Sequence, residues 1–125
     1  MSSVYLEKSL APDHLLGHVK ENGDVYRNDL GFDDRIGHVH LESGKVYARR
    51  LGKDKKIGHV DLENGKVYRS RFGPDEYVGR VEHNGDINLD RSLWPDDTVA
   101  RVEPFISFAH SGAAMLLLVL PALEK

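Results

Sequence analysis

The stretch IGHVDLENGKVYR, residues 57–69, occurs in variant form along most of the 125-residue chain. Residues 36–47 read IGHVHLESGKVY, and residues 16–26 read LGHVKENGDVY. The shared element Gly-His/Arg-Val occurs four times, followed by a weaker copy, at spacings of 20, 21, 21 and 21 residues. Its copies begin at Gly17, Gly37, Gly58, Gly79 and Ala100. Self-similarity at a fixed period indicates a repeat architecture, so one small unit is built about five times.

Each unit is predicted to be a β-hairpin, because β-branched and aromatic residues flank an Asn-Gly or Ser-Gly pair. In the short copies this pair predicts a two-residue turn, which places Val19 opposite Tyr26. In the long copies a three-residue loop ending in glycine places Val39 opposite Tyr47. We therefore expect valine to face tyrosine in every intact copy. The repeated glycine then either lies under the tyrosine ring of the facing strand or admits a close backbone approach.

A second kind of turn separates the hairpins. It has Pro-Asp at residues 11–14, 73–76 and 94–97, and it has glycine and aspartate without proline at residues 31–34 and 52–55. The pattern predicts an all-β meander of about ten short strands around a pseudo-symmetry axis. The chain opens with half a unit at Val4 and closes with the other half at Val102. We expect these two orphan strands to pair and close the ring, since closure removes exposed strand edges. Four intact hairpins with the orphan strands elsewhere are the alternative.

With its repeated IGHVDLENGKVYR unit and its tail SGAAMLLLVL, the chain resembles the β-flower proteins. These are small bacterial proteins whose hairpins are arranged as petals about a pseudo-symmetry axis. The resemblance covers most of the chain. It implies the fold and implies no established activity.

One position of the repeat alternates between histidine and arginine, both of which donate hydrogen bonds. Its members are His18, His38, His59, Arg80 and Arg101. We expect these side chains to bond a carbonyl group of the neighbouring hairpin. The alternative is a ring of donors that binds an anionic ligand. A metal site is disfavoured, because a guanidinium group does not ligate a cation and repels it.

The tail differs from the repeats, because residues 105–123, FISFAHSGAAMLLLVLPAL, contain no Asp, Glu, Lys or Arg. We predict a hairpin domain over residues 1–104 and an apolar segment over 105–125, packed on the same domain or in an oligomer interface. A helix over about 112–120 capped by Ser111 is expected, with a buried strand over 116–120 as the alternative. Such a run either forms a core or enters a membrane, and we expect the core.

Composition bounds the function. The chain is 40% apolar and 30% charged, with a net charge of −3 and interspersed signs, so a nucleic-acid partner is not expected. It has no cysteine, and its first residues lack the pattern of a signal peptide, so a cytoplasmic location is expected. No catalytic residue, cofactor or metal is nominated. The prediction is a non-enzymatic structural or interaction module that forms homo-oligomers, with membrane attachment through residues 105–123 as the alternative.

Overall fold

The computed structural model describes residues 1–7, 14–29, 32–90 and 97–124, which form ten strands and one C-terminal helix. The strands are β1 (Ser2–Leu6), β2 (His14–Val19), β3 (Asp24–Asp29), β4 (Phe32–Val39), β5 (Lys45–Ala48), β6 (Lys55–Val60), β7 (Lys66–Arg69), β8 (Glu76–Val81), β9 (Asp86–Leu89) and β10 (Asp97–Glu103). The predicted turns at residues 11–14 and 94–97 lie largely outside the described residues.

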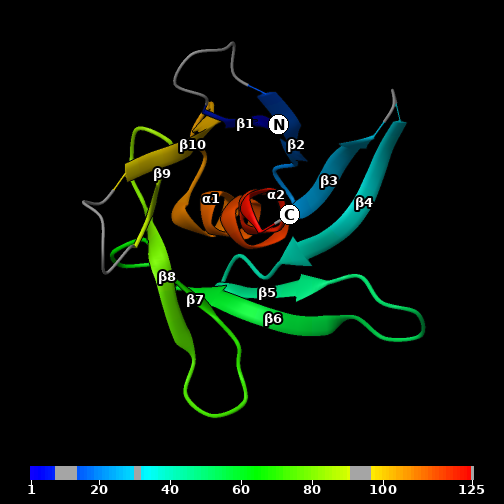
Figure 1. Ribbon diagram of the computed structural model, residues 1–125. Helices are drawn as coiled ribbons and strands as arrows, with labels where there is room; N and C mark the ends of the chain where they lie inside the picture. Colours follow the sequence, from blue (N-terminus) through cyan, green and yellow to red (C-terminus); the bar gives the residue numbers. More distant parts are fainter. Residues whose placement is uncertain (8–13, 30–31, 91–96, 125) are drawn as a thin grey trace.

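The strands form a closed antiparallel barrel in which each strand pairs with its neighbour in sequence, and β1 pairs with β10 (Figure 1). The all-β ring of hairpins is therefore confirmed, and so is its closure by the two orphan strands. The arrangement with four hairpins is wrong. Closure places Val4 opposite Val102, which completes a fifth unit from the two ends of the repeat region.

Two sets of turns lie at opposite ends of the barrel. The turns that contain Asn-Gly or Ser-Gly join β2 to β3, β4 to β5, β6 to β7 and β8 to β9. The other turns join β3 to β4, β5 to β6 and β7 to β8, and these strand pairs extend outward as petals (Figure 1). We call the outer ends of the petals their tips.

The hairpin register differs by one residue from the predicted one. Val19 lies opposite Val25, and His18 lies opposite Tyr26. The cause is that each loop is one residue longer than predicted. Lys20 bonds Asp24 across a three-residue loop in the short copy, and His40 bonds Lys45 across a four-residue loop in the long copy. A shift of one residue exchanges the two faces of a strand. Both valines therefore point inward, and the histidine and tyrosine point outward.

The repeated glycine admits a close approach and does not lie under a tyrosine ring. A Cβ atom on Gly58 would overlap the carbonyl oxygen of Tyr68, and it would lie 2.8 Å from Leu116 Cδ1. The tyrosine ring is on the outer face, where it stacks on His59. The same overlap with the facing strand occurs at Gly37, whose added Cβ would also lie 2.8 Å from a leucine of the helix.

A β-bulge precedes each repeated glycine. Val46 pairs with Gly58, but Tyr47 pairs with Lys56, so Ile57 is the extra residue. Strand alternation alone would place Ile57 on the outer face with the histidine. The bulge instead lets it pack against the core, and the added twist helps the petal to turn outward.

The tail forms a helix inside the barrel of its own chain (Figure 1). It comprises α1 (Phe108–Ala114), a π-helical turn (Met115–Val119) and α2 (Leu120–Leu123). The predicted start at Ser111 is wrong, because Ser107 is the N-cap and accepts a hydrogen bond from the backbone N–H of His110. The π turn lies just before Pro121. Since proline has no N–H and its ring clashes with a carbonyl of the preceding turn, the wider turn accommodates it.

The core is built between the helix and a ring of buried strand residues. Ten of them, two from each unit, are 0–3% exposed: Val4, Val19, Val25, Val39, Val46, Val60, Val67, Val81, Ile87 and Val102. Small residues of α1 face this ring. A Cβ atom on Gly112 would overlap the side chain of Val60. Further along the helix the side chains become larger, where Leu116 and Leu117 lie beside the repeated glycines.

Candidate functional site

The repeated His/Arg position lies on the outer wall of the barrel, on five different strands. His18, His38 and His59 are on β2, β4 and β6, and Arg80 and Arg101 are on β8 and β10. Each histidine stacks on the tyrosine opposite it, with ring centroids 4.8–5.1 Å apart and interplanar angles of 9–12°. In the unit that closes the barrel, Arg101 takes the histidine's place and lies 4.9 Å over the centre of the Tyr5 ring.

Each histidine also contacts a carboxylate of the next petal. The nitrogen–oxygen distances are 3.7 Å for His18–Asp33, 3.4 Å for His38–Asp54 and 3.1 Å for His59–Asp75. The expected partner was a backbone carbonyl, and the observed one is an aspartate at or near a tip. These contacts join neighbouring petals.

The two arginines have carboxylates two residues further along the chain. Arg80 donates to Glu82 at 3.0 Å, and Arg101 donates to Glu103 at 2.7 Å. The five side chains thus have separate partners at separate places on the wall. Among the described residues no group of three or more His, Cys, Asp or Glu side chains could hold a metal ion.

A second feature is a strongly uneven distribution of charge. Residues 45–71 contain nine basic and three acidic residues, a formal charge of +6, whereas the rest of the chain contains eight and seventeen, a formal charge of −9. The positive charge is densest around the β5–β6 tip. We call its five cations the basic face: Arg49, Arg50, Lys53, Lys55 and Lys56.

The basic face borders two grooves between petals. One groove, of about 750 Å³, lies beside Arg49 and Arg50 and has Leu116 and Leu117 of the helix among its lining. The other, of about 580 Å³, lies beside Lys55 and Lys56 and extends to Arg71 and Phe72 of the next petal. Both grooves thus combine leucine side chains of the helix with several cations, and each also has one carboxylate in its lining, Asp34 in the first and Glu124 in the second.

The cations of the basic face differ from their neighbours in having no carboxylate partner. Across the described residues no ion pair involves any of the five. By contrast, Arg69 bonds both Glu76 and Glu124, at 2.8 and 2.7 Å. These bonds raise the pKa of Arg69, and the bond from Arg69 lowers the pKa of Glu76. The positive charge of the basic face is therefore not neutralised within the described residues.

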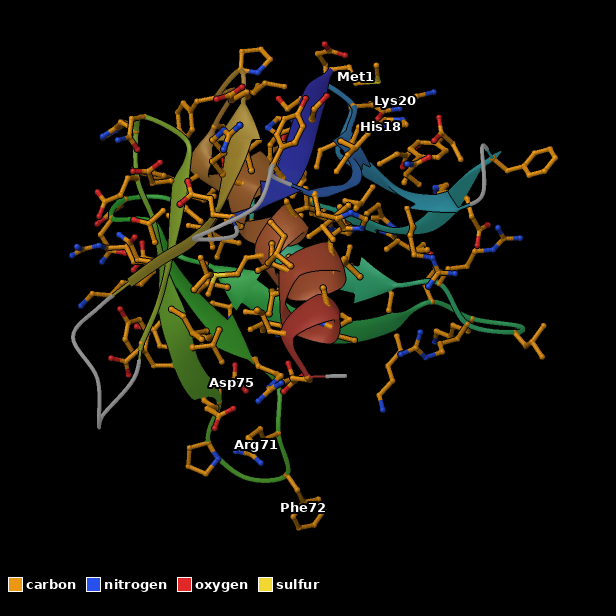
Figure 2. The ribbon with its side chains drawn as sticks, turned by 45° about the horizontal axis from the view of Figure 1, so that its top comes forward. Met1, His18, Lys20, Arg71, Phe72 and Asp75 are labelled. Carbon is orange, nitrogen blue, oxygen red and sulfur yellow. The ribbon has the colours of Figure 1, made fainter. Side chains whose placement is uncertain are left out.

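The petal tips expose large apolar side chains. Leu51 and Phe72 are fully exposed, at 106% and 110%, and Phe32 is 77% exposed. Figure 2 shows Phe72 projecting from the end of its petal. The repeat itself contained this signal, because an apolar residue recurs at spacings of 20, 21, 21 and 21. Its copies are Leu10, Leu30, Leu51, Phe72 and Leu93, of which the first, second and last lie outside the described residues.

Comparison with models of known protein families gives no match, and neither do the comparisons with curated proteins and with solved structures. In the part of the chain that the structure describes, no helix has the length and apolar character needed to cross a membrane. The site is therefore interpreted from its own geometry and charge.

Proposed function

We propose that the protein is a non-enzymatic binding module whose basic face engages an anionic partner. The observation that supports it is a cluster of five exposed or tip-borne cations without carboxylate partners in a chain of net charge −3. Oppositely charged surfaces increase the rate of encounter and orient the partner. The basic face is a better candidate for binding an anionic ligand than the His/Arg position, because the side chains at the His/Arg position already have carboxylate partners within the chain.

The rigid frame of the module also supports this proposal. Arg50 and Lys53 flank the β5–β6 tip, while Lys55 and Lys56 begin β6, which packs on α1 through the buried Val60. A closed barrel holds these charges in a fixed arrangement. Binding sites on loops that a rigid scaffold positions are common among proteins.

Charge reversal tests the proposal. Arg50→Glu/Lys56→Glu removes two cations from the basic face. Lys45→Glu/Lys66→Glu is the matched control, since it makes the same change in net charge at exposed lysines near the opposite turns. We expect the first variant to elute from a heparin column at lower salt than the control, which should elute closer to the parent. Coincident elution of the two variants would refute a localised site.

Three further predictions stand beside this proposal. Membership of the β-flower family is supported by petals arranged around a central helix. A cytoplasmic location remains a prediction from the sequence. The homo-oligomer also remains a prediction. The tail is not available as its interface, because Met115 and Leu116 are at most 4% exposed within their own barrel, so another surface would have to form the contact.

A further inference from the structure

The two fully exposed apolar tips lie on neighbouring petals. Leu51 is at the tip between β5 and β6, and Phe72 is at the tip between β7 and β8. Neither contributes to the core, so folding does not account for their size and apolarity. In each case the next residue is a glycine with a left-handed backbone, at φ +86° for Gly52 and +98° for Gly73. Each turn thus leaves its apolar side chain in solvent, and Figure 2 shows Phe72 at the end of its petal.

Cations surround these apolar side chains. Arg50 and Lys53 flank Leu51 in the sequence, and Arg71, which precedes Phe72, pairs with Glu76 at 2.6 Å. The groove between the two petals has Lys55 and Lys56 on one wall and Arg71 and Phe72 on the other. The edge that joins the two tips therefore carries an apolar pair, with the unpaired cations on the Leu51 side of it.

We propose that this edge docks on an anionic lipid bilayer, with Leu51 and Phe72 inserted among the acyl chains and the basic face on the headgroups. This inference rests on the proposed function and names its partner. Basic residues near apolar anchors are the combination that binds the surface of a membrane with anionic lipids.

The separation of the two apolar side chains favours a bilayer over other anionic partners. They stand on different petals with cations between them, so a continuous apolar phase can accept both at once. A folded protein would need two separate pockets for them. Proteins bind single-stranded nucleic acid largely by stacking its bases on aromatic side chains, and a leucine has no aromatic ring on which a base could stack.

Vesicle sedimentation separates this inference from the proposed function. The parent is expected to pellet with vesicles of phosphatidylcholine and phosphatidylglycerol, and to remain in solution with phosphatidylcholine alone. Leu51→Ser/Phe72→Ser should lower the partition onto the mixed vesicles by about tenfold or more, because two large apolar side chains no longer enter the bilayer. Its elution from heparin should stay that of the parent. Arg50→Glu/Lys56→Glu should weaken both the binding to heparin and the binding to the mixed vesicles.

The control is Leu41→Ser/Leu62→Ser, which changes two exposed leucines in the turns at the opposite end of the barrel and should pellet like the parent.

A parent that binds heparin but not the mixed vesicles overturns the docking inference and leaves the proposed function intact. A parent that binds neither overturns both. Equal pelleting of tip and control variants would show that the tips do not insert. If the parent bound a DNA oligomer more tightly than the mixed vesicles, the edge would be a nucleic-acid site and the inference would be overturned. If the parent formed dimers that only the tip variant abolished, the edge would be a contact between two copies of the chain, which would also overturn the inference.

Discussion

Gly44 and Gly52 have similar left-handed backbones, with φ of +79° and +86°, but different surroundings. A Cβ atom on Gly44 would overlap the carbonyl oxygen of Val60, whereas nothing lies within 4 Å of one on Gly52. Alanine at either position costs about 1 kcal/mol for its backbone conformation. Gly44→Ala adds about 1–3 kcal/mol for the overlap. Urea denaturation should therefore show the larger loss for Gly44→Ala, and equal losses would contradict the close approach.

His110 is a buried titratable residue of the helix, with both ring nitrogens engaged. Its Nδ1 lies 2.6 Å from Ser107 Oγ, and its Nε2 lies 2.8 Å from the carbonyl oxygen of Glu21. The carbonyl can only accept, so Nε2 carries a proton and donates it. Burial lowers the pKa of His110, and the positive N-terminus, which pairs with the Glu21 carboxylate, lowers this pKa further.

A lowered pKa makes the folded protein less stable in acid. The unfolded chain takes up the His110 proton near the ordinary value of about 6.5, while the folded chain resists it. The stabilisation is complete above that pH and is lost as the pH falls toward the lower folded pKa. His110→Gln removes this titration, so its free energy of unfolding should fall less between neutral pH and pH ~5 than that of the parent. Parallel pH profiles would show that His110 does not titrate on unfolding.

At the scale of elements, two serines in the helix have opposite roles. Ser107 Oγ accepts the backbone N–H of His110 at the start of α1. Ser111 is one turn later and fully buried, and its hydroxyl oxygen has no hydrogen-bond partner among the described residues. We expect Ser107→Ala to cost about 1 kcal/mol through the lost cap. Ser111→Ala should be neutral or stabilising by up to about 1 kcal/mol, because it removes an unsatisfied group and favours the helix. Thermal midpoints that rank the two the other way would contradict this assignment.

These elements show where sequence reasoning succeeds and where it stops. The period of 20–21 residues predicts the hairpins and their ring, because turn chemistry and strand alternation are local. The predicted register was wrong by one residue. The predicted loops of two and three residues and the observed loops of three and four residues both place glycine suitably in the turn, so turn chemistry does not distinguish them. Only the need to bury Val19 and Val25 together decides between them. Ser107 and Ser111 are likewise both suitable caps by sequence, and the structure uses the first.

At the scale of the whole molecule, the candidate site was the harder part to predict. A net charge of −3 conceals the positive segment of residues 45–71, and the repeat brings attention to what the units share. The basic face is what one petal has and the others lack. The His/Arg position is evident from the repeat, but the carboxylates that the histidines contact belong to the next petal, and only the folded ring shows which one each histidine meets.

The barrel is folded around its own tail. Six consecutive helix residues, Met115 to Leu120, are 0–7% exposed. At about 1.5–3 kcal/mol for each such side chain, their burial contributes on the order of 10 kcal/mol, comparable to the whole net stability of a domain of about 5–15 kcal/mol. The direct measurement is urea denaturation of residues 1–104 beside the full chain. The truncated chain should show no cooperative transition and should aggregate, whereas a monomeric truncation that unfolds cooperatively would show that the tail is not the core of the barrel.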